Sequence, residues 1–137
     1  MKILVQKFGG TSLKNHETRT KALEHIRRAR QEGYHVVVVV SAMGRLGDAY
    51  ATDTLLSMIE DPASLSNQEK DMLLSCGEII SSVVMSSLLN QEGIPAIAFT
   101  GREAGIQTTD DFGNAQIQVI DPSLIMKELK RDKVVVV

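Results

Sequence analysis

Residues 36–44 read VVVVVSAMG, and this stretch decides the fold class of the chain. Five consecutive valines offer no polar face, which is typical of a strand that is covered on both faces of a parallel sheet. Other apolar runs of strand length lie before and after it, at residues 3–5, 94–99, 117–120 and 134–137. Of these, the run at 117–120 alternates with polar residues and predicts a shorter, half-exposed strand.

Helical patterns separate these runs, over residues 15–32, over residues 66–90 and from Pro122 onwards. Gly33 is a natural stop for the first helix. Ser66 and Glu69 have the spacing of a capping box, which opens the second helix, and we expect that helix to break or kink near Cys76-Gly77. Strands that alternate with helices imply βαβ units and a mainly parallel sheet in one compact unit.

Composition and charge exclude several classes of protein. The 137 residues include 15 basic and 17 acidic side chains, so no charge excess points to nucleic acid or to an anionic membrane. No uninterrupted apolar run approaches about 18 residues, and we therefore expect no membrane span. The one cysteine, Cys76, excludes an internal disulfide framework and is expected to be a small core residue. These features predict a cytoplasmic protein.

Two adjacent glycines follow the first strand, within Lys7-Phe8-Gly9-Gly10-Thr11-Ser12. Ligands in open α/β sheets bind outside the carboxyl ends of the strands, where glycine lets backbone N–H groups approach an anion. Lys7 adds a positive charge, so the segment is a candidate phosphate cradle. It is neither a Walker A motif nor a dinucleotide G-x-G-x-x-G motif. A simple glycine turn between strand and helix explains the same residues.

Polar residues at other positions have two explanations each. Ser41 follows the valine strand and can hold phosphate or carboxylate oxygens, whereas Asp53 or Thr54 more simply caps the next helix. Glu78 stands in the apolar stretch Leu73–Ile80, where a buried carboxylate without a partner is costly. Glu78 therefore either faces solvent near a helix start or faces a cationic ligand.

Taken together, these segments resemble the aspartokinases of the amino acid kinase family. Order and spacing agree over essentially the whole chain, at residues 7–12, 37–44, 73–78, 99–101, 104–105 and 113–115. The likeness is strongest to the Bacillus-type enzymes of the diaminopimelate and lysine pathway. The resemblance implies a three-layer αβα sandwich with a mainly parallel sheet. It also implies phosphoryl transfer from ATP to the side-chain carboxylate of L-aspartate, giving 4-phospho-L-aspartate, the first step of lysine, threonine and methionine biosynthesis.

The same resemblance assigns roles to residues of this chain. The ATP and phosphate ligands would be Lys7, Phe8, Gly9, Gly10 and Ser41. Lys7 would be catalytic, because it would neutralise the transferring phosphoryl group. At the other end of the site, Thr52 would contact L-aspartate and Glu78 would pair with its α-ammonium group.

Cofactors and partners are likewise implied by the family. ATP chemistry implies Mg²⁺, but His16, His25 and His35 have no metal-type spacing and no protein ligand is identified. The expected partners are L-aspartate and ATP, with no nucleic acid and no membrane, and a homo-oligomer as the full-length enzyme.

Members of the family are much longer than this chain. We therefore expect residues 1–137 to be the N-terminal part of the amino acid kinase catalytic domain, without the rest of that domain or the ACT regulatory domains, and inactive alone. Two alternatives stay open. One is another amino acid kinase, of the glutamate or acetylglutamate type, and the other is a non-catalytic binding or assembly module.

Overall fold

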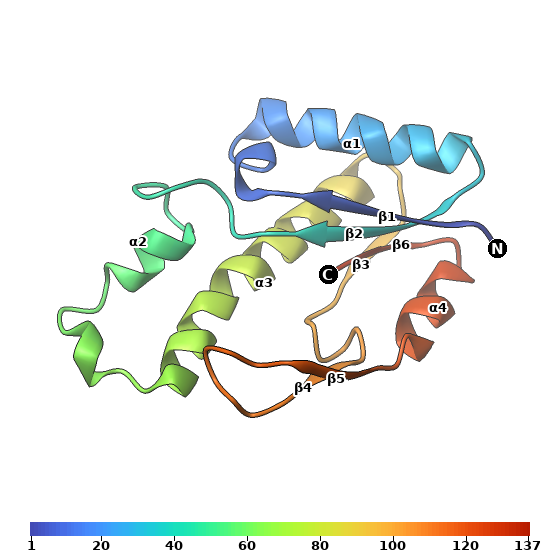
Figure 1. Ribbon diagram of the computed structural model, residues 1–137. Coiled ribbons are helices and arrows are strands. Elements are labelled where there is room, and N and C mark those ends of the chain that lie inside the picture. The colour runs from blue at the N-terminus through green and yellow to red at the C-terminus, as the bar shows by residue number, and fades with distance from the viewer.

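The computed structural model describes all residues from Met1 to Val137. Its main sheet has four parallel strands in the order β1-β2-β6-β3, and a separate pair of antiparallel strands forms a hairpin, β4-β5 (Figure 1). The strands span Ile3–Phe8 (β1), His35–Val40 (β2), Ala96–Ala98 (β3), Ile106–Thr108 (β4), Ile117–Ile120 (β5) and Val134–Val136 (β6). The longer helices span His16–Gln31 (α1), Thr52–Leu56 (α2), Asn67–Gln91 (α3) and Ser123–Leu129 (α4), with short 3-10 turns at Gly10–Ser12 and Pro62–Ser64.

The valine strand β2 lies between β1 and β6, and its side chains alternate between two apolar layers. Val36, Val38 and Val40 pack in the larger cluster, together with apolar side chains of α1 and α3. Val37 packs on the opposite face with Leu129 of α4. Figure 1 shows α1 and α4 on opposite sides of the sheet. The predicted αβα arrangement with a mainly parallel sheet is confirmed.

The strand β6 is the most deeply buried part of the sheet. Val134, Val135 and Val136 are fully buried, and they pair with β2 on one side and with β3 on the other. A central strand in a parallel sheet is enclosed by neighbours and by helices on both faces, which suits an all-valine sequence.

The helix α3 runs without interruption from Asn67 to Gln91, so the chain does not break at Cys76-Gly77, the first of the two expected outcomes there. Gly77 serves close packing instead, because a Cβ there would lie 2.7 Å from the Cβ of Ala42. Cys76 is exposed, which corrects its expected place in the core. The predicted capping box is confirmed, with the Ser66 hydroxyl accepting from the Glu69 N–H and the Glu69 carboxylate accepting from the Ser66 N–H.

The composition of α3 also changes the expectation about membrane spans. An 18-residue window in this helix has a mean hydropathy of 1.7, so by length and composition alone α3 could cross a membrane. Polar residues interrupt the apolar sequence of this helix, so it contains no unbroken apolar run of that length. Core helices of globular domains meet the same criteria, and α3 contributes Met85 and Leu89 to the core beneath the sheet.

The β4-β5 hairpin contains one strand that the sequence did not indicate. Residues 106–108 are too short and too mixed to stand out as a strand, yet they pair with the predicted strand at 117–120. All four residues of β5 are exposed, rather than half-exposed as expected. The helix that follows begins at Ser123 rather than Pro122, and Asp121 accepts a hydrogen bond from the Ser123 N–H at 3.0 Å.

Candidate active site at the carboxyl edge of the sheet

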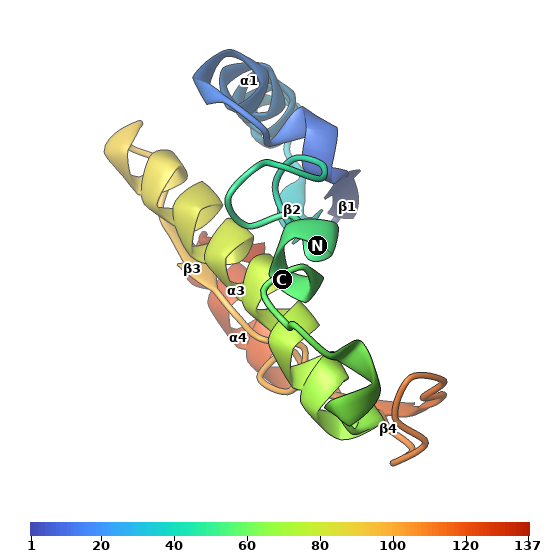
Figure 2. The ribbon, with the colours of Figure 1, turned by 90° about the vertical axis from the view of Figure 1, so that its left-hand side faces the viewer.

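All four strands of the main sheet are parallel, so their carboxyl ends meet at one edge. Figure 2 is viewed from the left of Figure 1, toward which the arrows of β1 and β2 point. The segments that follow the strands there are Gly9-Gly10, Ser41-Ala42, Phe99-Thr100-Gly101 and Val137. The chain thereby brings three of its glycine-bearing or hydroxyl-bearing loops to the same edge.

The loops after β1 and β2 are held together by backbone hydrogen bonds. The Ser41 N–H donates to the Phe8 carbonyl at 3.2 Å, and the Gly44 N–H donates to the Gly10 carbonyl at 3.0 Å. Gly10 approaches the Ala42 carbonyl so closely that a Cβ at this position has no room. The second glycine of the predicted cradle is therefore required by loop-to-loop packing.

Several donors at this edge have no partner within the protein, and three of them belong to predicted site residues. The backbone N–H of Gly9 has no acceptor, and a Cβ on this residue would meet open space. The Ser41 hydroxyl makes no hydrogen bond, and the exposed Lys7 ammonium forms no ion pair. Lys7 leaves β1 on the face opposite Phe8, since successive side chains alternate along a strand. An amide, a hydroxyl and a cation without partners are the groups that bind an anion.

Glu78 of α3 reaches the same edge from the helix layer. Its Oε1 accepts the Ala42 N–H at 3.3 Å, and its Oε2 has no hydrogen-bond partner. Gly77 makes this approach possible, because the helix backbone there lies against Ala42 and the Tyr50 carbonyl. Glu78 is exposed, but it lies in the interior of α3. Its carboxylate is therefore not stabilised by the start of a helix, which was one of the two explanations for its position. Its free oxygen is available to a cationic group.

A small cavity of about 210 Å³ lies beside Glu78. Its lining comes from α3, from the end of β3 and from the last residue, namely Ser75, Glu78, Ile79, Ser82, Phe99, Thr100, Gly101 and Val137. Thr100 is fixed at the rim by Glu103, whose Oε2 accepts the Thr100 N–H at 2.8 Å and the Thr100 hydroxyl at 2.9 Å. These two hydrogen bonds, the backbone one foremost, lower the pKa of Glu103.

Most of the predicted site residues lie together at the carboxyl edge of the sheet, whereas Thr52 lies apart from the cavity beside Glu78. Gly9, Gly10 and Ser41 meet at the loops of β1 and β2, and Glu78 joins them through Ala42. Phe8 offers only its backbone, because its side chain packs against the core.

Thr52 is not brought into the cavity beside Glu78. It is exposed at the first position of α2, and its hydroxyl makes no hydrogen bond. Thr54, one of the expected helix caps, instead accepts the Gly47 N–H and ties the loop to α2, while Ala51 is the N-cap without a side-chain bond.

Sequence reasoning missed the roles of Ala42, Gly77 and Thr100. Ala42 acts through its N–H, which no side-chain pattern reveals. Gly77 carried a usable signal, because an isolated glycine in a helical pattern costs about 1 kcal/mol and often marks close packing. The Thr100–Glu103 spacing was visible but was given no role.

The described residues offer no ready site to Mg²⁺. No three His, Cys, Asp or Glu side chains lie close enough together to hold a metal ion. Mg²⁺ in enzymes of phosphate chemistry is commonly held by one or two carboxylates and by the substrate phosphates. The donor set of residues 1–137 therefore does not by itself fit a resident cation.

The sequence of this chain is similar to known proteins over its whole length. Aspartokinase 1 of Bacillus subtilis (strain 168) is 53% identical over 138 residues, a match that covers 100% of this chain and 34% of that protein. Aspartokinase 2 of the same organism is 40% identical, with 100% and 33% covered. The chain thus spans about a third of the length of the curated relatives it matches.

Solved structures of aspartate kinases are also similar to this chain. The crystal structure of aspartate kinase from Synechocystis superposes with a TM-score of 0.78 at 36% identity, covering 98% of this chain and 21% of that one. E. coli aspartokinase III, solved in complex with aspartate and ADP, matches in fold with a TM-score of 0.76 at 19% identity, covering 98% and 40%. The model of the amino acid kinase family matches residues 2–137. The chain belongs to the amino acid kinase family.

Proposed function

We propose that this chain is the substrate-binding part of an aspartate kinase, which transfers a phosphoryl group from ATP to the side-chain carboxylate of L-aspartate. One observation carries the proposal. A carboxylate with a free oxygen, on Glu78, accepts the Ala42 N–H beside the unbonded hydroxyl of Ser41, and the Ser41 N–H is bonded to the end of β1 that precedes Gly9. The carboxylate can accept hydrogen bonds from the ammonium group of an amino acid. The donors beside it can bind the oxygens of a phosphate group, so the two substrates of a phosphoryl transfer could lie side by side here.

The chemistry of this reaction matches the side chains present. The nucleophile is a carboxylate that is already ionised at neutral pH, since its reference pKa is about 4. The reaction then needs no general base, and it depends on positioning and on neutralisation of charge. Lys7 supplies the positive charge, and the Gly9 N–H and Ser41 hydroxyl supply hydrogen bonds to phosphate oxygens.

Aspartate and ATP are proposed as substrates on two further grounds. The relatives with 53% and 40% identity are aspartokinases, and the E. coli enzyme of the same fold is described in complex with aspartate and ADP. Within this proposal, residues 1–137 are the N-terminal part of the catalytic domain of a longer cytoplasmic enzyme in lysine and diaminopimelate biosynthesis. The enzyme acts as a homo-oligomer, and Mg²⁺ reaches the site with the nucleotide.

A panel of phosphoryl acceptors tests the proposal in the full-length protein. ATP is supplied with L-aspartate, L-glutamate or N-acetyl-L-glutamate, and the acyl phosphate is trapped with hydroxylamine and measured as the hydroxamate. We expect hydroxamate with L-aspartate alone. A product from either glutamate compound would favour another amino acid kinase, and no product from any acceptor would favour a non-catalytic module.

A further inference from the structure

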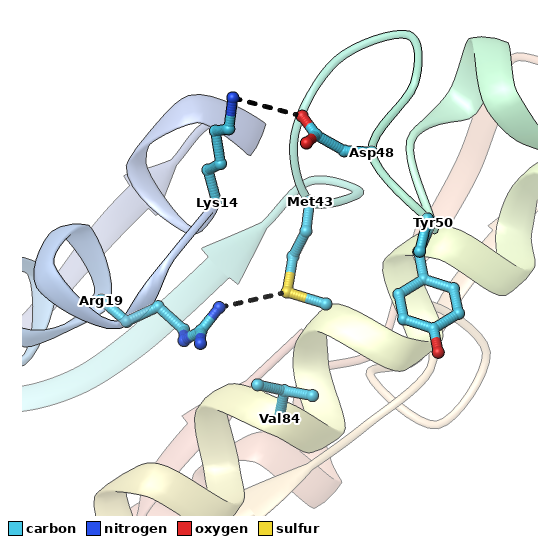
Figure 3. Close-up of a pocket in the computed structure, with 7 residues that line it drawn as sticks. Lys14, Arg19, Met43, Asp48, Tyr50 and Val84 are labelled. Carbon is cyan, nitrogen blue, oxygen red and sulfur yellow. Dashed lines mark hydrogen bonds and ion pairs between the residues drawn. The ribbon is translucent and has the colours of Figure 1, made fainter.

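A second cavity lies beside the loop that follows Ser41, and Glu78 is not among its lining residues. Its volume is about 340 Å³, within the range of small-molecule sites. It is open to solvent and is bordered by the segment around the start of α1, the β2-α2 loop and the middle of α3, through Lys14, Arg19, Met43, Asp48, Ala49, Tyr50 and Val84. Figure 3 shows these side chains converging from three separate elements.

Arg19 is the unusual group in this cavity. It is half-buried, and one terminal nitrogen donates to the Leu13 carbonyl at 2.9 Å and contacts the Met43 sulfur at 3.8 Å. No carboxylate lies within ion-pair distance of it. The other two half-buried arginines, Arg27 and Arg30, each have a carboxylate partner, at 3.1 and 2.9 Å. A half-buried cation without a counter-charge is costly, so Arg19 is matched to an anion from outside the chain.

The geometry of Arg19 restricts the shape of that anion. Leu13 and Met43 occupy one terminal nitrogen, and the edge formed by Nε and the second terminal nitrogen makes no hydrogen bond. In Figure 3 the guanidinium group points toward the Met43 sulfur, and Val84 lies below Met43. A planar edge with two parallel N–H donors is the partner of a carboxylate in a bidentate pair.

The other charged and apolar residues that line the cavity restrict the chemistry of the anion further. Lys14 lies 3.6 Å from Asp48, so with Arg19 the cavity carries one net positive charge. That charge suits a monoanion better than a dianionic phosphate. Met43, Ala49, Val84 and the Tyr50 ring form the apolar part of the lining. The ligand therefore needs an apolar body next to its charged group.

We propose that this cavity, called here the Arg19 cavity, binds a small monocarboxylate with a compact apolar body. Its carboxylate pairs with the free edge of Arg19, and its body lies against Met43, Val84 and Tyr50. The site is separate from the candidate active site but shares the loop of residues 41–51 with it. Gly44 in this loop donates to Gly10, and Ala42 donates to Glu78. A ligand in the cavity therefore also changes the positions of Ser41 and Ala42, because these residues belong to the same loop.

The test uses 3-phenylpropanoate as the probe and 3-phenylpropanamide as its neutral control. The full chain carries a ¹³C label on the methionine methyl groups, and a Met43→Leu variant assigns the Met43 signal. We expect the carboxylate, and not the amide, to shift the Met43 signal in a saturable way at millimolar concentration. No shift, or an equal shift with the amide, overturns the proposal.

Variants then locate the interaction. Arg19→Gln is expected to weaken binding at least about tenfold, whereas Arg28→Gln, an exposed arginine on the same helix, leaves the affinity unchanged. Equal affinity in Arg19→Gln overturns the proposal. Because Arg19 also supports the Leu13 carbonyl, Asp48→Asn gives a second test, in which the amide oxygen can still accept the Arg45 N–H. Removing its negative charge is expected to tighten binding about two- to fivefold, and unchanged or weaker binding contradicts the site.

Discussion

Gly77 is the residue on which the geometry of the candidate site depends most. A glycine inside a helix costs about 1 kcal/mol relative to alanine, and here its missing side chain is replaced by the packed atoms of Ala42 and Tyr50. The close approach lets the neighbouring Glu78 reach the Ala42 N–H. The chain thus has a residue of low helix propensity at the position where α3 contacts the loop of Ala42.

Gly77→Ala is therefore expected to destabilise the protein by roughly 1–3 kcal/mol, the usual cost of overpacking. A Cβ at this position would lie 2.7 Å from the Cβ of Ala42 and 2.9 Å from the Tyr50 carbonyl oxygen. Urea unfolding measures the change. Gly101→Ala is the matched control, since a Cβ there meets nothing within 4 Å. Equal stability of the two variants would refute the packing role.

Lys7 gives a second prediction at this scale. Its ammonium has no partner in the protein, and if it neutralises the transferring phosphoryl group it acts mainly in the transition state. In the full-length enzyme Lys7→Ala should lower kcat by about a hundredfold or more, with a smaller change in the KM for aspartate. Lys2→Ala, which removes an exposed lysine at the opposite end of β1, is the control. A rise in that KM with kcat unchanged would mean that Lys7 has another role.

The helix α4 is joined to β6 by a cluster of charges around Glu128. The side chain of Glu128 is 9% exposed, and it pairs with Arg131 at 2.9 Å and with Lys133 at 2.8 Å. The contact with Lys133 is the main cause that lowers the pKa of Glu128 below its ordinary value of 4.5. The charge cluster holds the turn that leads the chain back into the centre of the sheet.

This cluster predicts a pH-dependent stability. A carboxylate with a lowered pKa in the folded state stabilises it fully above the ordinary pKa, and the contribution disappears as the pH falls through the folded value. Glu128→Gln should therefore lower Tm at pH 7 by more than it does at pH 3. Thermal unfolding at the two pH values measures this, with Glu60→Gln as an exposed control. A deficit of the same size at both pH values would contradict the ionic origin.

The elements differ in how far their sequence determines them. The runs at residues 36–40 and 134–136 identified buried strands because apolar side chains on both faces leave no other solution. The strand at 106–108 escaped notice because its three residues are stabilised by pairing with β5, which is a tertiary effect. For the same reason the sequence left two explanations open for Gly9-Gly10. The unpartnered N–H of Gly9 emerges only once the loops of β1 and β2 are assembled.

At the scale of the whole molecule, the parallel sheet brings an acceptor and a set of donors to one edge. The cavity beside Glu78 measures about 210 Å³, below the usual range of about 300–1,000 Å³ for small-molecule sites. That volume suits a small amino acid better than a nucleotide. The relatives that this chain matches as aspartokinases are about three times as long.

We accordingly expect the 137-residue polypeptide on its own to show no aspartate-dependent release of ADP. A coupled assay with purified polypeptide, ATP and L-aspartate measures this, and the full-length protein under the same conditions is the control. Turnover by the polypeptide alone would show that these residues already contain a complete site.

The central claim is that Glu78 binds the ammonium group of L-aspartate, and Glu78→Gln tests it most directly. Glutamine retains an oxygen to accept the Ala42 N–H but loses the charge, and a charge-assisted hydrogen bond contributes about 1.5–3 kcal/mol. In the full-length enzyme, titration calorimetry should show aspartate affinity reduced at least about tenfold and ATP affinity unchanged, with Glu24→Gln on α1 as the exposed control. Unchanged affinity for aspartate, or an equal loss for ATP, would contradict the account.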